Sequence, residues 1–309
     1  MKKSDLACLL TLAALWGASY LFMRVGAGEF GALSMAGARA AGASLLLLPI
    51  LAARRDGSLA ELRRHWQRIA LVGMTNCALP FLLFGYAALS INASLSAIFN
   101  AATPLYAAII GWLWIRERID PPRAASLVLG FAGVAWLVCD GAGFKDGATG
   151  WAVLACVAAT MLYAFSAHYS KQRLAHIDPL VVATGSQLSS AIVLAAPAWI
   201  WRPSVMPSAS SWLALLALTV ASTALAYVLF FHLVARVGAA RTMAVPFLVP
   251  AFGVLWGVLF LGEVFSAKMA LGAALIVAGT ALTTGVLKRA DGGRKTPASS
   301  CLHSDRRGH

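Results

Sequence analysis

Residues 93–117 read ASLSAIFNAATPLYAAIIGWLWIRE, and residues 239–263 read AARTMAVPFLVPAFGVLWGVLFLGE. The second stretch repeats the first without a gap, 146 positions later. The coinciding residues are Pro104 and Pro250, Gly111 and Gly257, Glu117 and Glu263, and farther along the chain Gly133 and Gly279. Matches of alanine or leucine mean little in so apolar a chain. Proline, glycine and glutamate in one register indicate an internal repeat.

The composition excludes a soluble globular domain. Apolar residues make up 60% of the 309 residues and charged residues 12%, against about 45–50% and 25% in soluble domains. The apolar residues are gathered in runs of about 20, the length that spans a membrane. Because a lipid-exposed backbone must satisfy its own polar groups, we expect these runs to form a bundle of membrane-spanning helices.

Ten such runs are separated by short polar segments. We expect helices at 6–25, 33–51, 69–89, 93–114, 124–138, 151–169, 180–200, 212–234, 242–261 and 267–287. The fifth run is short, and Pro121 and Pro122 suit the first turn of a helix that begins nearer to them. The first run follows two lysines, as in a secretion signal. It is long enough to span and has no convincing cleavage site, so we read it as a retained helix.

The distribution of basic residues predicts the topology. With the N-terminus in the cytoplasm and ten spans, 20 of the 25 lysine and arginine residues fall in cytoplasmic segments. Those outside are Arg24, Lys145, Arg202 and Lys268, and Arg39 lies within a span. This asymmetry follows the positive-inside rule. We therefore expect a multi-pass protein of a bacterial inner membrane with both termini cytoplasmic, and we assign the net charge of +13 to topology rather than to nucleic-acid binding.

The repeat divides the ten expected helices into two halves of five, at residues 1–143 and 147–287. The polar, basic tail at 288–309 has no apolar period, and we expect it to be a disordered cytoplasmic segment. Because five is an odd number, the second half enters the membrane upside down relative to the first. Inverted repeats are typical of secondary transporters, whose substrate site lies between the repeats near the middle of the membrane.

Several motifs lie at fixed places along this frame. The first expected helix reads LWGASY at 15–20 and ends at Arg24, and the second contains Arg39. The fourth reads NAATPL at 100–105 and closes on Arg116-Glu117-Arg118, while the ninth closes on Leu261-Gly262-Glu263. In order and spacing these motifs resemble those of the drug/metabolite transporter superfamily, in particular the EamA family. The second repeat departs from that pattern, since it has LYA at 162–164 where a Trp-Gly motif would be expected.

The resemblance implies a ten-helix transporter that moves a small metabolite, such as an amino acid or a derivative, by alternating access. It favours export over import. Its partners would be the small-molecule substrate and membrane lipid, in a monomer or homodimer. One alternative is a membrane-embedded enzyme, but no nucleophile–base pair or carboxylate–histidine cluster is recognisable. Another is a receptor or scaffold, against which the repeat argues. The five cysteines and six histidines lack CxxC and HExxH spacings, so we expect no metal site and no cofactor.

Arg39 is the sharpest candidate for a functional residue. It lies about six residues into its expected helix, roughly 9 Å deep at about 1.5 Å per residue. A charge in the middle of a membrane costs about 2.5–3.5 kcal/mol on insertion scales, so the side chain should face the protein interior or water. There it could clamp a carboxylate or phosphate. The alternatives are snorkelling to the outer surface and a structural bond to helix carbonyls.

Other polar, aromatic and kink-forming residues complete the candidate site. The candidates for a substrate cavity, besides Arg39, are Trp16, Tyr20, Asn76, Asn100, Tyr163 and Tyr227. Each could instead pack or bond to a neighbouring helix. Pro104 and Pro250 remove a backbone hydrogen bond within a span and would act as pivots or fixed kinks. Glu117 and Glu263 end helices on opposite membrane sides, where they would take part in gating or anchor the helix ends.

The charge distribution generates a topology prediction. Reporter fusions after Arg55, Arg118, Lys171 and Lys288 should report the cytoplasm, and fusions near Lys145 and Arg202 the periplasm. Paired alkaline phosphatase and fluorescent-protein fusions measure this directly. A periplasmic C-terminus would contradict both the number of helices and the inversion of the second half.

Overall fold

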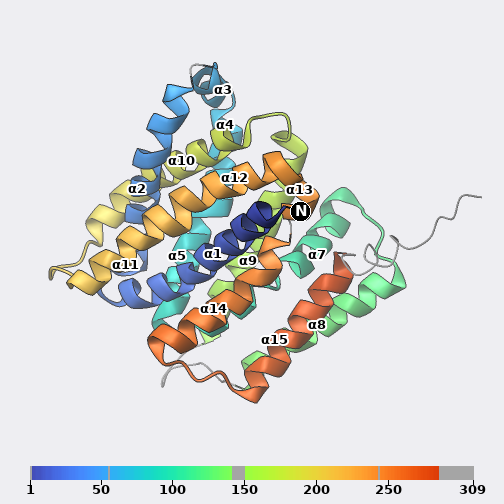
Figure 1. Ribbon diagram of the computed structural model, residues 1–309. Coiled ribbons are helices and arrows are strands. Elements are labelled where there is room, and N and C mark those ends of the chain that lie inside the picture. The colour runs from blue at the N-terminus through green and yellow to red at the C-terminus, as the bar shows by residue number, and fades with distance from the viewer. Residues whose placement is uncertain (1, 55, 141–149, 243, 285–309) are drawn as a thin grey trace, which may run out of the picture.

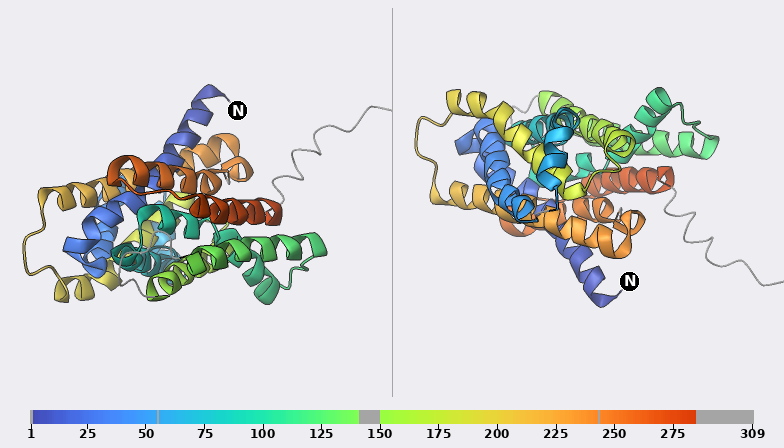
Figure 2. Two further views of the ribbon diagram at one scale, coloured as in Figure 1. Left: turned by 90° about the horizontal axis from the view of Figure 1, so that it is seen from below. Right: turned by 90° about the horizontal axis from the view of Figure 1, so that it is seen from above.

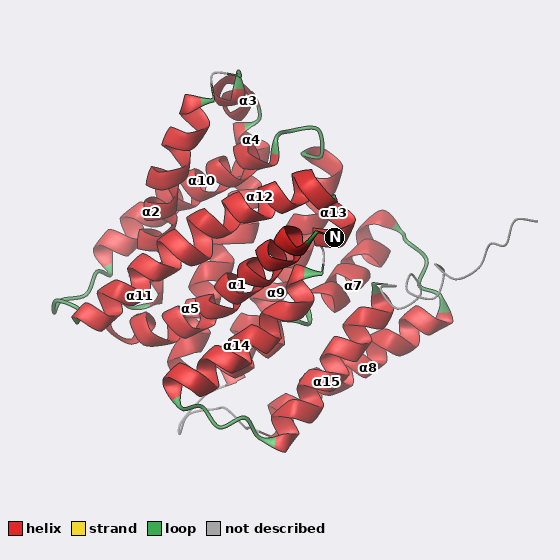
Figure 3. Cartoon of the chain, in the orientation of Figure 1, coloured by secondary structure: helices red, strands yellow, loops and turns green. Residues whose placement is uncertain are grey.

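The computed structural model describes residues 2–54, 56–140, 150–242 and 244–284, and its regular elements in those ranges are all helices (Figures 1 and 3). In chain order they are α1 (Lys3–Phe30), α2 (Ala32–Ala53), α3 (Ser58–Arg64), α4 (Trp66–Gly73), η1 (Met74–Ala78), α5 (Leu79–Ser90), α6 (Ala93–Asn100), α7 (Thr103–Ile115), α8 (Pro121–Asp140), α9 (Gly150–Arg173), α10 (Pro179–Ile200), α11 (Ala209–Thr219), η2 (Val220–Leu225), α12 (Ala226–Val237), α13 (Ala239–Thr242), α14 (Val245–Leu261) and α15 (Ala267–Thr283).

These helices confirm the expected all-helical membrane class. Within the described ranges, eight helices or helix runs are long and apolar enough to cross a membrane, while α14 and α15 are apolar but shorter. The fifth span begins at Pro121, as its paired prolines predict. The short helix α3 was not expected from the sequence. The expected basic tail lies outside the described residues, as does the segment around Lys145.

Two of the long spans change their winding at matching places. Between α4 and α5 the chain forms the π-helical turn η1, and between α11 and α12 it forms η2. The first residues of the two turns, Met74 and Val220, are separated by the 146 residues of the repeat. A π turn adds a residue to the helix and shifts its hydrogen bonds, and such turns gather at functional sites. The internal repeat therefore includes the π-helical turn, which occurs at the same position in both halves.

The fourth span is broken rather than kinked in its interior. α6 ends at Asn100, and α7 begins at Thr103, so Pro104 lies in the first turn of a new helix, where its missing N–H costs nothing. The expected span at 93–114 is confirmed, but it consists of two helices, α6 and α7, rather than one. The carbonyl groups freed at the break have partners, because Thr103 Oγ1 donates to Asn100 O at 2.7 Å and Thr280 Oγ1 to Ala101 O at 3.0 Å. Pro250, by contrast, is buried inside α14.

The helices α8 and α15 lie side by side at one edge of the bundle (Figures 1 and 2). Their contact is reciprocal. A Cβ atom on Gly279 would lie 2.7 Å from Ser126 O, and one on Gly133 would lie 2.8 Å from Gly272 O. Ser126 and Gly272 are themselves 146 residues apart. The matched glycines thus meet matched points on antiparallel helices, as two halves related by a two-fold axis would.

Close approach of helix backbones also fixes α1, which crosses the middle of the bundle in Figure 1. A Cβ on Gly17 would lie 2.8 Å from Gly253 N of α14, and a Cβ on Gly253 would lie 2.4 Å from Ala97 Cβ of α6. Small residues at such crossings let helices pack tightly in lipid, where no hydrophobic force pushes them together. Close contacts between helix backbones therefore stabilise the centre of the bundle.

The α8–α15 contact generates a stability prediction. Gly279→Ala places a methyl group 2.6 Å from Gly130 N, and because the obstacle is backbone, the helices must separate. We expect the change to destabilise the purified protein by about 1–3 kcal/mol. The matched control is Gly28→Ala on α1, where a Cβ meets nothing within 4 Å. Thermal unfolding in detergent measures both variants, and equal melting temperatures would contradict the tight α8–α15 contact.

Candidate functional site

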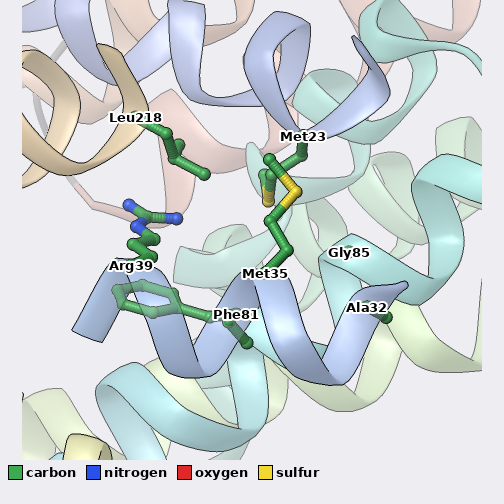
Figure 4. A pocket seen from close by; sticks show the side chains of 8 residues that line it. Met23, Ala32, Met35, Arg39, Phe81, Gly85 and Leu218 are labelled. Atoms are coloured by element: carbon green, nitrogen blue, oxygen red, sulfur yellow. The ribbon is translucent and has the colours of Figure 1, made fainter. Parts of the chain in front are cut away.

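Arg39 lies in the interior of the bundle, with 6% of its surface exposed. Its Nε donates to Thr223 Oγ1 of η2 at 2.8 Å, and its guanidinium carbon lies 3.7 Å from the centroid of the Phe81 ring. Figure 4 shows the guanidinium beside that ring, close to Leu218. The side chain therefore does not snorkel to the surface. Its bonds run from a helix of the first half to a π turn of the second.

The positive charge of Arg39 has no carboxylate partner in the described part of the chain. Carboxylates there pair with other arginines, as in Arg54 with Asp178, Arg123 with Glu117, and Arg236 with Asp5. Of the five N–H donors of a guanidinium, that of Nε is bonded to Thr223, and the ring of Phe81 covers one face. A buried, unneutralised cation is costly in a membrane. Binding an anion through the remaining donors would offset that cost.

Three tyrosine side chains lie in the interior near Arg39. Tyr20, Tyr163 and Tyr227 all lie close enough to interact electrostatically with the guanidinium. The Phe84 ring joins two of them, since its centroid is 5.4 Å from that of Tyr20, edge to face, and 6.1 Å from that of Tyr163, stacked. Arg39, these tyrosines, Phe81 and Phe84 form one group of interior side chains, which we call the Arg39 chamber. Such a mixture of rings and few polar groups is typical of small-molecule sites.

The space beside Arg39 is small in this structure. A cavity of about 10 Å³ lies against Arg39, Phe81, Met23 and Met35 (Figure 4). That is about the space of one water molecule, whereas small-molecule pockets measure about 300–1,000 Å³. A metabolite can therefore reach Arg39 only if the surrounding helices move apart.

The remaining residues that were expected to line a cavity contact near neighbours or another aromatic ring. Trp16 packs against Phe230, with ring centroids 5.6 Å apart. Asn76 lies in η1, its Nδ2 4.0 Å from Cys77 Sγ. Asn100 ends α6, where its Oδ1 accepts from Thr103 Oγ1 at 3.4 Å. The structure thus brings Arg39 and the three tyrosines together, whereas Asn100 serves the helix break.

Glu263 joins the two halves at one end of α14. Its carboxylate accepts from Ala93 N at 2.7 Å, Ser94 N at 2.9 Å and Ser94 Oγ at 2.6 Å, all at the start of α6. These amides have no partner within their own helix, and the helix dipole favours a negative charge there. Gly257 leaves the room for this carboxylate, since a Cβ there would lie 2.4 Å from Glu263 Oε2. The arrangement matches the expected anchoring of a helix end.

Glu117 holds the equivalent place in the first half. Its Oε2 accepts from Arg123 Nη1 at 3.3 Å, and its backbone N donates to Gly111 O at 3.2 Å. Glu263 N donates to Gly257 O in the same way, at 3.1 Å. The preceding residues, Arg116 and Gly262, both have left-handed backbones, with φ of 58° and 63°. The glutamates are therefore set by the same turn in both halves.

Several residues in this region were missed from the sequence, namely Phe81, Thr223, Cys77 and Gln187. Thr223 and Cys77 are 146 residues apart, one in each π turn. Each accepts from an interior side chain of the opposite half, Thr223 from Arg39 and Cys77 Sγ from Gln187 Nε2 at 3.4 Å. The repeat register could have paired these two positions. Nothing in the sequence marked them as contact points, because both are small residues common in apolar helices.

A bundle of long apolar helices around a buried cation defines a multi-pass protein of the inner membrane. The sequence profile of the EamA-like transporter family matches residues 4–139 and again residues 150–285, and the chain belongs to this family. The family implies a small-molecule substrate and a transporter rather than an enzyme. The resemblance to the drug/metabolite transporters is thereby confirmed.

Similar proteins cover nearly the whole chain. The uncharacterized transporter YvbV of Bacillus subtilis is 26% identical over 283 residues, 90% of each chain. The probable terminal-alkyne amino-acid exporter of Streptantibioticus cattleyicolor is 25% identical over 302 residues, 97% of this chain and 98% of that protein. A protein of known crystal structure aligns with a TM-score of 0.65 at 21% identity, over 94% of this chain and all of the other. That last likeness concerns the fold.

The cap on α6 generates a prediction for Glu263. Glu263→Ala removes the acceptor of three hydrogen bonds and should destabilise the protein by about 2 kcal/mol. Glu263→Gln keeps one acceptor oxygen, so its melting temperature should lie between those of Glu263→Ala and the parent protein. Thermal unfolding of the purified proteins measures this order of stabilities. Glu61→Ala on α3, which also removes one negative charge, is the control, and an equal effect of Glu61→Ala and Glu263→Ala would contradict the cap.

Proposed function

We propose that this chain is a secondary transporter that moves a small metabolite with an anionic group across the inner membrane by alternating access. The proposed frame is ten spans in two inverted halves, residues 1–143 and 147–287, with both termini in the cytoplasm. The proposed direction is export. An amino acid or derivative is the substrate class we favour, because the Streptantibioticus cattleyicolor relative carries the name of an amino-acid exporter.

The observation that carries the proposal is the buried, carboxylate-free guanidinium of Arg39. It bonds across the two halves, from α2 to Thr223 of η2. A ligand that binds there touches both halves at once, so its binding can be coupled to their relative movement. The reciprocal glycine contact of α8 and α15 supports the inverted arrangement. The small space beside Arg39, about 10 Å³, suits a stage of the transport cycle in which no substrate is bound.

Binding would follow from ordinary guanidinium chemistry. Arginine presents planar pairs of N–H donors that match the two oxygens of a carboxylate. The aromatic walls around it exclude water, which strengthens such a charge-assisted bond. Tyr20, Tyr163 and Tyr227 would supply additional hydroxyl groups to the bound molecule. The π turns η1 and η2 would supply the places at which the spans can change their winding as the halves rock.

The test compares variants of Arg39 in proteoliposomes loaded with a mixture of labelled amino acids and organic acids. Arg39→Lys keeps the charge but loses the planar pair of donors, and we expect efflux to fall by at least about tenfold while membrane expression stays normal. Arg39→Gln should be lower still, because charge and donor pair are both lost. Arg24→Lys is the matched control, since Arg24 Nη1 bonds the backbone carbonyl of Ala88 at 3.1 Å on a different helix.

Near-normal efflux from a well-expressed Arg39→Lys variant would overturn the proposal that Arg39 binds the anionic group of the substrate. Poor expression of both Arg39 variants would instead assign Arg39 to folding. A pH gradient imposed across the same vesicles shows whether protons drive the movement. Parent protein that moves no component of the mixture would overturn the proposed substrate class.

A further inference from the structure

One face of α2 lines the small cavity beside Arg39. Four of the lining residues, Ala32, Met35, Ala36 and Arg39, have the spacing of neighbours on one side of a helix. Ala32 is the first residue of α2 and lies about 10 Å along the helix axis from Arg39. In the proposed topology this end of α2 faces the periplasm. The lined face therefore leads from the buried guanidinium toward the outside of the cell.

Two methionines fill the space along this face. Met23 of α1 and Met35 of α2 are both buried, and in the view of Figure 4 they lie between Arg39 and Ala32. Gly26 leaves room for the tip of Met35, since a Cβ on Gly26 would lie 2.6 Å from Met35 Cε. A methionine side chain is unbranched and turns about three bonds, so it adapts to irregular space. These two side chains can therefore change their shape without a movement of the backbone.

The equivalent place in the second half is filled by larger or stiffer side chains. At an offset of 146 residues, the counterparts of Met23, Met35, Ala36 and Gly85 are Tyr169, Val181, Val182 and Phe231. These four counterparts belong to one hydrophobic cluster. Within it the Phe231 ring is stacked on that of Tyr227, with centroids 5.9 Å apart. Branched and aromatic side chains thus stand where the first half has alanine, glycine and methionine.

The counterpart of Arg39 shows the same difference. It is Gly185, where a Cβ would lie 2.6 Å from Ile69 Cγ2 of the same hydrophobic cluster. Because the proposed halves are inverted, equivalent places lie toward opposite sides of the membrane. One end of the Arg39 chamber is then filled by adaptable methionines, and the other by a cluster that includes stiff valines and stacked rings.

We propose that Met23 and Met35 form the periplasmic gate of the Arg39 chamber. The transported molecule would pass along the face of α2 that carries Ala32 and Ala36, with its anionic group bound by Arg39 at the inner end. The inference rests on the proposed function, because a gate has meaning only if a molecule passes. Small residues beyond the methionines leave room for that molecule once the two side chains turn aside.

The test uses cysteine substitutions and a membrane-impermeant anionic thiol reagent, sulfonatoethyl methanethiosulfonate. It is added to right-side-out membrane vesicles, whose outer surface is the periplasmic one. Met35→Cys places a thiol in the gate, and Val181→Cys is the matched control, because Val181 is the buried counterpart in the second half. Met35→Cys should react at least about tenfold faster than Val181→Cys, since a minor open state exposes the gate alone. The parent protein, with its own five cysteines, sets the background.

Modification of the gate should also stop transport. Efflux of the labelled mixture from proteoliposomes with Met35→Cys should fall to the level of protein-free vesicles after reaction, and dithiothreitol should restore it. Gly28→Cys is the control, since Gly28 is exposed near the end of α1 and a Cβ there meets nothing within 4 Å. It should react without loss of efflux. Ala36→Cys takes the place of Met35→Cys if that variant does not fold or transport.

Three results would overturn the gate and leave the proposed transport standing. They are equal reaction rates of Met35→Cys and Val181→Cys in right-side-out vesicles, reaction of Met35→Cys in inverted vesicles alone, and full efflux through modified Met35→Cys. If the parent protein moves no component of the mixture, the proposed function fails and the gate fails with it. Efflux by the parent therefore separates the two failures.

Discussion

The requirement that each backbone polar group find a partner within the membrane governs this molecule. It makes long helices the default, and it makes every departure from a regular helix expensive unless other groups restore the lost bonds. Among the departures in the described residues are two π turns and the break between α6 and α7, and polar side chains lie at all three. Thr280 bonds the carbonyl freed at Ala101, and Thr223 Oγ1 of η2 donates to Leu218 O of α11. The proposed substrate site lies beside the two π turns.

The same constraint explains why the packing and the site use different residues. Glycines bring backbones together at the edge of the bundle and along α1, because van der Waals contact is the main attraction between helices in lipid. Around Arg39 the walls are instead aromatic, large and interrupted by hydroxyl groups. Such walls can separate and close again without breaking a backbone contact. Tight glycine contacts at the edge and an aromatic interior would suit the proposed alternating access.

The two halves share features of the backbone but differ in the side chains at their interface. Their turns, π segments and terminal glutamates agree in register, down to the left-handed residues Arg116 and Gly262. The side chains that meet across the interface differ, because Arg39 of the first half bonds Thr223 of the second, whereas Gln187 of the second half bonds Cys77 of the first. In the proposed transport cycle, duplication would provide the mechanics, and divergence of a few interior residues would provide the specificity.

The sequence by itself determined the membrane class, the all-helical fold and the family, and it favoured an interior position for Arg39. It did so because apolar run length, charge placement and the repeat of proline, glycine and glutamate are local properties of the chain. It also predicted the start of the fifth span at Pro121 and a structural irregularity at Pro104, although the outcome there is a break.

The tertiary structure alone decided which side chains meet. That Thr223 receives Arg39, that Glu263 caps α6 and that Gln187 bonds Cys77 all depend on contacts between residues more than 100 positions apart. Helical periodicity assigns a residue to a face, but neighbouring helices decide what that face meets. In an apolar span a threonine, a cysteine or a glutamine looks alike whether it packs or binds, and only the surrounding helices distinguish the two.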